Sequence, residues 1–394
     1  MRGTVVFYPI SEISVDSTNH SHIGDRLAAL AAMARQYCPP NPAVACVLAA
    51  ADGTVLGAGH TQATGQAHAE VMALRDAAAR GHDVRGATAH VTLEPCSHYG
   101  RTPPCCDALV AAGIKRVVVT ILDPNPLVAG QGVARLRAAG IEVDVLPPGS
   151  AAAQAARELN LGFFSRMLRR TPWVRLKAAA SLDGITALDN GASQWITAAP
   201  ARADGHAWRA RACAILTGVG TILADDPALD ARLAGTPRAP RLVIVDSELR
   251  TPPHAAALVV APGRPVLVVA ARAEPARRRA LEDRGVTVIE LPGDDGRVDL
   301  AALLRELAAR EINEVHVEAG ATLNGALLRA ALVDELLLYT APKLLGDGAG
   351  IACGIFAAGP LRDVAAALPL QFNSATLVGN DLRVLARVAG RDRF

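Results

Sequence analysis

The sequence has few aromatic residues, no excess of one charge and no long uninterrupted apolar segment. Aromatic residues make up 3% of the 394 residues although hydrophobic residues make up 51%, so Ala, Val and Leu must fill most of the core. The formal net charge is +2, and arginine is far more frequent than lysine. Neutral charge with so few aromatics argues against a nucleic-acid partner, whereas scattered arginines suit a small phosphate.

The sequence also lacks the features of a membrane or secreted protein. Nowhere do 18 apolar residues follow one another, and polar residues interrupt the first twenty residues where a secretory signal would be apolar. The seven cysteines are odd in number, and Cys96, Cys105 and Cys106 lie close together. This spacing favours metal binding in a reducing compartment over a set of disulfides. We therefore expect a cytoplasmic protein that neither spans nor binds a membrane.

The length predicts two domains, and the hydrophobic pattern predicts an α/β fold for both. Apolar runs alternate with helical stretches, which indicates layered sheets with much parallel pairing. We expect a tail at 1–21, which is predicted to be disordered, a first domain at 22–148, a helical connector at 149–170 and a second domain at 171–394. In the first half the expected strands are 43–50, 87–93, 116–121 and 141–146, and the expected helices are 27–35, 69–80, 105–112 and 133–139. In the second half the expected strands are 173–181, 214–220, 241–247, 265–270, 314–320 and 335–345.

Two predicted helix starts carry the side chains of a hydrolytic zinc site. Such a site needs three protein ligands, an open position, and a base that is not itself a ligand. His68 and Glu70 in "HAE" fall in the first turn of one helix, and the prolines of "TPPCC" suit the start of another, which holds Cys105. Cys96, in the turn after a strand, completes the set. We predict that His68, Cys96 and Cys105 bind one zinc ion and that Glu70 transfers protons.

Other residues near these motifs could contact a substrate. Asn41 offers an amide for a pyrimidine edge, although it could also be an ordinary turn residue. His60 lies just upstream of the first motif, and His98 with Arg101 lies between the two cysteine ligands, where a cation suits a sugar phosphate. The alternative for these three is an ordinary surface position. Cys106 could replace a neighbour as ligand, but we interpret it as a core thiol, as we do Cys38, Cys46, Cys213 and Cys353.

The first half resembles a known enzyme family. H-x-E with a later P-C-x-x-C is typical of zinc nucleobase deaminases, but here eight residues separate the two cysteines. The motifs "HAEV", "PCSHYGRTPPCC", "PNPAVACVL" and "DPNPLVAGQG" closely resemble the deaminase half of the bifunctional riboflavin-biosynthesis deaminase/reductases. The resemblance implies a cytidine-deaminase-like fold with the ligands and proton shuttle named above. It also shows a departure: the family commonly has glycine at the position of Ala45, whose methyl group is expected to lie close to the pyrimidine site.

The second half lacks the G-x-G-x-x-G of a Rossmann dinucleotide site. Instead "EVHVEAGATLNGALL" reads as a strand, a glycine turn and a helix, whose first amides could hold a pyrophosphate. An ordinary α/β turn would have the same pattern. "KAAASLDGITA", "SQWIT", "TGVGTILADDPAL" and "VEAGATLNG" resemble the reductase half of the same family, which implies a dihydrofolate-reductase-like fold and NADPH.

The resemblance implies the site residues of the reductase. Those expected to line the cofactor are Ala179, Trp195, Thr221, Asp225, Ser247, Gly320, Ala321, Thr322, Leu323, Asn324, Gly325 and Ala326. Those expected to meet the substrate are Ser193, Arg209, Leu229, Arg232 and Glu318. Lys177 is either a partner of the opening sugar or an ordinary solvated lysine.

The resemblance therefore implies two successive reactions on a small pyrimidine ribosyl phosphate. Zinc-dependent hydrolysis removes an amino group from 2,5-diamino-6-(5-phosphoribosylamino)pyrimidin-4-one, and NADPH then reduces the ribosyl group to ribityl. One alternative is a nucleoside or tRNA deaminase with an unrelated partner domain. Another is a non-catalytic, zinc-stabilised scaffold that binds nucleotides. Self-association into a homo-oligomer is left open.

Overall fold

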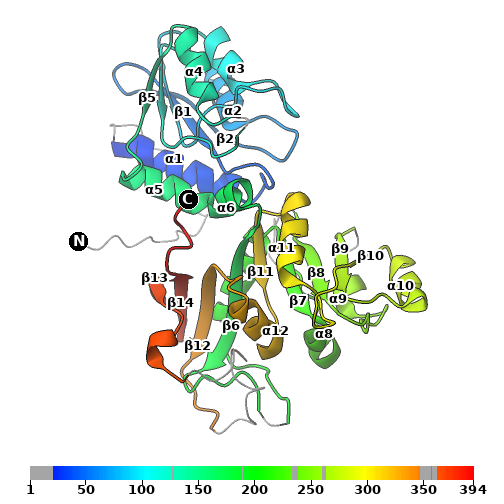
Figure 1. Ribbon diagram of the computed structural model, residues 1–394. Helices are drawn as coiled ribbons and strands as arrows, with labels where there is room; N and C mark the ends of the chain where they lie inside the picture. Colours follow the sequence, from blue (N-terminus) through cyan, green and yellow to red (C-terminus); the bar gives the residue numbers. More distant parts are fainter. Residues whose placement is uncertain are drawn as a thin grey trace. The chain divides into compact units, whose positions relative to one another are not determined.

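The chain folds into two compact units. A computed structural model describes residues 21–126, 128–188, 190–232, 238–259, 263–346, 356 and 362–394 (Figure 1). The first unit consists of the described residues as far as Ala32, with Val44–Asp123 and 128–156; the second consists of Met33–Ala43, Pro124–Pro126 and the described residues from Arg157 onward. Residues 1–20 of the predicted tail, and Cys353, lie outside the described residues. Ser21 is the first residue of helix α1.

The first unit is built on a mixed five-stranded sheet of order β2-β1-β3-β4-β5. β1 pairs antiparallel with both β2 and β3, whereas β3, β4 and β5 are parallel. This confirms the predicted α/β class and the four predicted strands. The strands are β1 (Ala45–Ala49), β2 (Val55–His60), β3 (Thr88–Val91), β4 (Arg116–Val119) and β5 (Glu142–Val145), and the helices are α1 (Ser21–Ala34), α2 (Ala69–Ala79), α3 (Cys105–Ala111) and α4 (Gln131–Ala138).

Strand β2 is an addition to the predicted strands. Its sequence VLGAGH contains two glycines, which are depleted in strands, so it gives no strand signal. The glycines are needed for packing: a Cβ on Gly57 would lie 2.4 Å from the carbonyl oxygen of Ala73, and one on Gly59 would lie 2.5 Å from the amide nitrogen of Ala73. Helix α2 therefore lies directly on the backbone of β2.

The predicted single connector helix is two helices, α5 (Ala151–Leu159) and α6 (Leu161–Arg169). They meet at Asn160, whose φ of −120° and ψ of 17° are not helical. The Asn160 side chain accepts a hydrogen bond from the Ala43 amide (2.7 Å) and donates one to the Ala43 carbonyl (3.1 Å). Asn160 thus pairs with backbone far away in the sequence, an interaction that helix periodicity does not reveal.

The second unit is built on a nine-stranded sheet of order β10-β9-β8-β7-β11-β6-β12-β14-β13. Seven of the strands are parallel, and the last two form an antiparallel hairpin at one edge. The strands are β6 (Trp173–Ser181), β7 (Ala214–Gly218), β8 (Arg241–Val245), β9 (Val266–Ala270), β10 (Thr287–Glu290), β11 (Glu314–Val317), β12 (Glu335–Ala341), β13 (Leu370–Val378) and β14 (Asp381–Val388); the helices are α7 (Ala199–Arg211), α8 (Val219–Asp225), α9 (Ala256–Val259), α10 (Pro275–Glu282), α11 (Leu300–Ala309) and α12 (Ala321–Arg329), with a 3₁₀ turn at Val364–Ala366.

The connections of this sheet diverge at its carboxyl edge. β7 leads through α8 to β8 on one side, whereas its neighbour β11 leads through α12 across β6 to β12 on the other side (Figure 1). Where two adjacent parallel strands connect in opposite directions, their loops separate and leave a ligand site beyond the carboxyl ends. A cofactor is therefore expected between the starts of α8 and α12.

A chain of buried ion pairs joins strands at the opposite edge of the sheet. The Arg175 guanidinium, with 2% of its side chain exposed, donates to Glu314 (3.1 Å) and to Glu335 (2.6 Å) on the strands at either side. Glu314 is also paired with Arg35, and Glu335 with Arg387 (3.3 Å). Buried charges are tolerated only when they are paired in this way, so each member depends on the others.

Among the described residues, the structure contains no helix with the length and apolar character needed to cross a bilayer.

Candidate active sites

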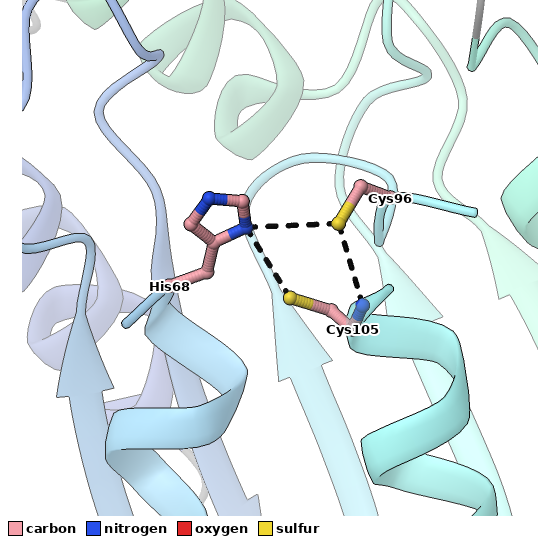
Figure 2. Close-up of side chains that lie close together, drawn as sticks. All are labelled: His68, Cys96 and Cys105. Atoms are coloured by element: carbon pink, nitrogen blue, oxygen red, sulfur yellow. Dashed lines mark hydrogen bonds between the residues drawn. The ribbon is translucent and has the colours of Figure 1, made fainter. Parts of the chain in front are cut away.

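Three side chains from two helix starts meet in the first unit. His68 is the N-cap of α2, Cys105 is the first residue of α3 after Pro104, and Cys96 lies in the turn after β3. Nδ1 of His68 is 3.6 Å from Sγ of Cys96 and 3.4 Å from Sγ of Cys105 (Figure 2). The structure thus brings together the three ligands that the sequence predicts.

The spacing of these atoms fits a zinc ion. Tetrahedral bonds of about 2.3 Å to sulfur and about 2.05 Å to nitrogen separate an N and an S ligand by about 3.6 Å. Both observed N–S distances lie close to this value, and the three ligand atoms all lie within 4.8 Å of one another. Two thiolates and one imidazole are also ligands that zinc prefers.

The electrostatics of the three residues favour deprotonation at one sulfur. Hydrogen bonds from Cys105, and then from His68, lower the pKa of Cys96 to about 4 despite its burial. The Cys105 amide also donates to Sγ of Cys96 (3.3 Å) at the amino end of α3. The Cys96 thiolate in turn raises the pKa values of His68 and of Cys105. Cys96 is therefore the ligand that is already prepared to bind a cation.

Glu70 is buried beside these ligands. It lies in the first turn of α2 and is 3% exposed. Burial, and second the negative charge of Cys96, raise its pKa to about 7, while His68 and Cys105 act in the opposite direction. A carboxyl group with a pKa near neutrality can both accept and return a proton.

Two neighbours keep the site in shape. The Thr102 hydroxyl lies 3.4 Å from Nε2 of His68, so it can fix the tautomer that leaves Nδ1 free for a metal. The fully buried Cys106 thiol donates to the carbonyl oxygens of Pro95 (3.4 Å) and Gly132 (3.6 Å). These contacts agree with the interpretation of Cys106 as a core thiol.

The loop that carries Cys96 is held by the residue two positions before it. Glu94 is buried and accepts hydrogen bonds from the amides of Asp123 (3.2 Å), Gly130 (2.9 Å) and Val133 (3.0 Å). A Cβ on Gly132 would lie 2.1 Å from the carbonyl oxygen of Pro95. The "AGQG" segment therefore packs directly against the backbone next to Cys96.

The remaining residues predicted for the deaminase substrate are more dispersed. His60 ends β2, with Nδ1 3.1 Å from the Thr61 carbonyl, and Arg101 is exposed in the loop between the cysteines. His98 lies in the same loop, and its buried Nδ1 has no hydrogen-bond partner among the described residues. Asn41 belongs to the segment Met33–Ala43, which groups with the second unit. Their role in substrate binding stays a prediction.

Ala45 is the first residue of β1, which lies between β2 and β3 in the first sheet. It is fully buried on β1, and its amide donates to the Thr92 hydroxyl (2.9 Å). The effect of its methyl group on the pyrimidine stays a prediction.

In the second unit, most residues predicted for the cofactor follow the carboxyl ends of neighbouring strands. Thr221 and Asp225 lie on α8 after β7, and Ser247 follows β8. Gly320 is the N-cap of α12 after β11, and residues 321–326 form its first turns. Ala179 lies near the carboxyl end of β6. These segments lie at the carboxyl edge of the sheet, where the connections diverge.

The start of α12 fits a phosphate group. No side chain caps this helix, and a Cβ on Gly320 would meet nothing within 4 Å. The amide end of a helix attracts anions. Gly218, at the start of α8, lies close enough to Leu323 for an added Cβ to be 3.2 Å from its Cδ2, so the two helix starts are neighbours.

Trp195 is presented to solvent between β6 and α7. Its side chain is 63% exposed, and the Arg202 guanidinium lies 4.5 Å from the ring centroid. Nζ of Lys343 donates to the Trp195 carbonyl (3.0 Å). A flat ring held in this way can stack on a ligand. Ser193 lies in the same loop.

Two residues predicted for the reductase substrate, Arg209 and Glu318, form a cluster directly after β11. Arg209 pairs with both carboxylate oxygens of Glu318, and Nη2 donates to Oε2 at 2.8 Å. Nζ of Lys177 lies 3.5 Å from Oε2, and Nε2 of the fully buried His316 lies 3.3 Å from Oε1. Although burial opposes ionisation, Arg209 and then Lys177 hold the pKa of Glu318 well below its usual value.

Arg232 is joined to this cluster by residues that the sequence does not indicate, whereas the Leu229 side chain packs in an apolar core cluster. Nη1 of Arg209 donates to the Asp230 carbonyl (3.0 Å), and the Asp230 carboxylate accepts from Nε of Arg232 (3.0 Å). The Arg232 amide donates to Nδ1 of His206 (3.3 Å). His206 and Asp230 belong to no motif that predicts them, although "DDPAL" directly precedes Asp230.

Comparison with known proteins identifies the family. The model of the "Cytidine and deoxycytidylate deaminase zinc-binding region" matches residues 25–121, and that of the "RibD C-terminal domain" matches residues 172–384. The riboflavin biosynthesis protein RibD of Escherichia coli K12 is 44% identical over 370 residues, which cover 91% of this chain and 96% of that protein. The chain belongs to the RibD family.

Other members of the RibD family are similar along the whole fold. RibD of Aquifex aeolicus is 39% identical over 90% of this chain and 94% of its own. A solved structure of RibD from Acinetobacter baumannii has a TM-score of 0.81 at 39% identity and covers 93% of this chain and 98% of that chain. The Thermotoga maritima diaminohydroxyphosphoribosylaminopyrimidine deaminase/5-amino-6-(5-phosphoribosylamino)uracil reductase has a TM-score of 0.81 at 31% identity, with 94% and 100% coverage. The predicted fold, a cytidine-deaminase-like domain followed by a reductase domain, is confirmed.

Proposed function

We propose that this chain catalyses two successive steps of riboflavin biosynthesis. The first is hydrolytic deamination of 2,5-diamino-6-(5-phosphoribosylamino)pyrimidin-4-one, and the second is reduction of the ribosyl group of the resulting uracil to ribityl by NADPH. The observation that carries the proposal is the meeting of His68, Cys96 and Cys105 beside the buried Glu70, in a chain whose second unit is a RibD reductase domain.

His68 through Nδ1, with Cys96 and Cys105, would hold one zinc ion. A zinc ion with three protein ligands supplies Lewis acidity at its open fourth position. Glu70 takes a proton from water and delivers one to the departing ammonia, and its raised pKa suits both directions of transfer. Thr102 orients the imidazole.

In the second unit the starts of α8 and α12 would hold the phosphates of NADPH, and the nicotinamide supplies the hydride. Trp195 packs against the bound ligands. Arg209 and Glu318 orient the ribosyl hydroxyls, with Lys177 adding positive charge beside the sugar. Arg232, whose side chain is 62% exposed, is available for the ribose phosphate.

Two observations disfavour the alternatives. A structural zinc site would use four protein ligands, yet the Cys106 thiol is engaged with two backbone carbonyls. A deaminase with an unrelated partner domain does not agree with the reductase-domain match over residues 172–384. Nucleic acid is therefore not among the substrates that we propose.

The test is to supply the diaminopyrimidinone ribosyl phosphate to the purified, zinc-loaded chain. Ammonia release and the absorbance of NADPH are followed in separate assays. We expect ammonia without NADPH, and NADPH oxidation only after ammonia has formed. Ammonia release from free cytidine or from tRNA, without release from this substrate, would overturn the proposal.

A further inference from the structure

A buried arginine outside the predicted site holds the backbone of the substrate loop. Arg264 is 8% exposed and precedes β9. Its Nη1 donates to the Leu229 carbonyl (2.6 Å), and its Nη2 donates to the carbonyls of Ala228 (3.3 Å) and Ala257 (2.5 Å). One guanidinium thus ties the loop before Arg232 to helix α9.

Arg209 extends this arrangement by one residue. It donates to the Asp230 carbonyl, so three successive carbonyls, those of residues 228, 229 and 230, all accept hydrogen bonds from guanidinium groups. Because a guanidinium donor fixes each of these carbonyl groups, the backbone of residues 228–230 has little freedom to change conformation. Two guanidinium groups, those of Arg264 and Arg209, therefore hold the loop together.

The loop needs such support because its conformation is unfavourable. Leu229 has φ of 48° and Asp226 has φ of 38°, in the left-handed region that residues with a Cβ rarely adopt. In this conformation the loop places Asp230 to pair with Arg232, and it places the Arg232 amide against His206. Arg232 therefore makes two contacts from this loop, one through its side chain and one through its amide. Each depends on the conformation of the backbone that Arg264 holds.

Burying an arginine in order to donate hydrogen bonds to carbonyl groups costs desolvation free energy. Burial lowers the pKa of Arg264, and its side chain donates to neutral carbonyls, whereas Asp230 acts on it only through its charge. A guanidinium is suited to this position because it presents several donors in one fixed plane, which a lysine cannot do.

We propose that Arg264 is a positioning residue of the reductase, which fixes the Ala228–Asp230 backbone so that Arg232 can receive the phosphate of the ribosyl substrate. This inference rests on the proposed function. Arg264 is expected to act through the loop and to touch neither substrate nor cofactor.

The test uses Arg264→Met in the full chain, with 5-amino-6-(5-phosphoribosylamino)uracil as reductase substrate. We expect KM for this substrate to rise about tenfold or more, because small displacements of a binding group are costly. The KM for NADPH, the kcat at saturation and ammonia release should change little. Arg264→Lys, which keeps the charge but cannot fork onto the carbonyls, should recover only part of the loss.

A matched control separates positioning from general destabilisation. Arg166 is another partly buried arginine of the second unit, bonded to Asn313 (2.6 Å) and to the Pro40 carbonyl (3.1 Å). Arg166→Met should leave KM for the uracil substrate unchanged. Hydrogen exchange should accelerate at the Arg232 amide in Arg264→Met and not in Arg166→Met.

An unchanged KM in Arg264→Met, or an equal rise in both variants, would overturn the inference. A loss in kcat without a change in KM would also do so. If Arg264→Met does not fold, Arg264→Lys is judged by the same criteria. A wild-type chain that does not reduce the substrate would instead refute the proposed function, so the two failures are distinguishable.

Discussion

Both carboxylate oxygens of Glu318 are held by a single side chain, the guanidinium of Arg209. This bidentate pair keeps the carboxylate ionised and fixes its plane, with Lys177 3.5 Å away as a second cation. The side chains that we assign to the sugar are thus oriented before substrate arrives. Substrate contacts should be lost selectively when residues attached to this cluster are changed.

Replacement of Arg232 tests the phosphate contact. Arg232→Ala should raise KM of the reductase for its substrate about tenfold or more, since a charged hydrogen bond contributes about 1.5–3 kcal/mol. Steady-state oxidation of NADPH measures this, and ammonia release should not change. Arg250→Ala is the control, because Arg250 is also exposed and also lies near a carboxylate, that of Glu248. Equal KM values in the two variants would remove Arg232 from the site.

Replacement of Glu70 tests the proton transfer. Glu70→Gln should lower the rate of ammonia release about 10²–10⁴-fold, the usual contribution of a general acid–base, while zinc remains near one per chain. Glu142→Gln, on the exposed surface of β5, should behave as wild type. Ammonia release at the normal rate from Glu70→Gln would contradict the assignment, and loss of zinc would mean that Glu70 supports the metal.

The close contact of Gly132 predicts an effect on zinc without any change of ligand. Gly132→Ala should displace the Pro95 carbonyl and with it Cys96, because the new Cβ would lie 2.1 Å from that oxygen. We expect zinc affinity to fall about tenfold or more, as when a supporting residue is removed, measured by competition with a chelator. Gly149→Ala, where a Cβ meets nothing within 4 Å, should keep wild-type affinity. Equal zinc affinities of Gly132→Ala and Gly149→Ala would show that the loop that carries Cys96 can move to accommodate the added methyl group.

Acid should destabilise the second unit in a defined pH range. Pairing with arginines depresses the pKa values of Glu314 and Glu335 against the effect of burial. The contribution of these two pairs to the free energy of unfolding is present above about pH 4.5, near the pKa of an unfolded glutamate, and is lost as the pH falls further. Each tenfold difference in proton affinity between the folded and the unfolded chain contributes about 1.4 kcal/mol. Burial raises the pKa of Asp334 to about 6, so this group has the opposite effect and adds stability as pH falls from about 6 to about 4.

The free energy of unfolding of the second unit should therefore fall steeply below about pH 4.5, and the contribution of Asp334 to it should grow as the pH falls from about 6 to about 4. Urea unfolding followed by tryptophan fluorescence measures this unit alone, because all three tryptophans, Trp173, Trp195 and Trp208, lie in it. Asp334→Asn should remove the contribution of Asp334 and keep the fall below about pH 4.5. A stability that stays constant down to about pH 3 would show that the buried ion pairs contribute nothing.

The cluster of His68, Cys96 and Cys105 can be predicted from sequence because its residues lie beside local signals. His68 is the N-cap residue of α2, and Pro104 directly precedes the helix that begins at Cys105, so two helix starts place both side chains. The strands rich in Val, Ile and Leu are also predictable, because their composition is a local signal. Thr102 cannot be assigned in this way, since its partner is defined only once the loop between the cysteines has folded.

The rest of the site depends on contacts that leave no pattern. Arg264 binds backbone carbonyls, and a carbonyl is the same in every residue, so no spacing of side chains indicates it. Asn160 interrupts an apparently continuous helix because it pairs with Ala43, which is distant in sequence. The reductase residues themselves are predicted through resemblance to a family and not from periodicity.

Gly57 and Gly59 show that a position can matter to this chemistry without contributing a polar atom. If every position of the chain were randomised and selected for deamination, these two should accept almost no alternative, as strictly as the cysteines do, because any methyl group there would push away the helix that begins beside the imidazole. At these two positions only glycine lets helix α2 pack on β2, and this packing holds His68 in place.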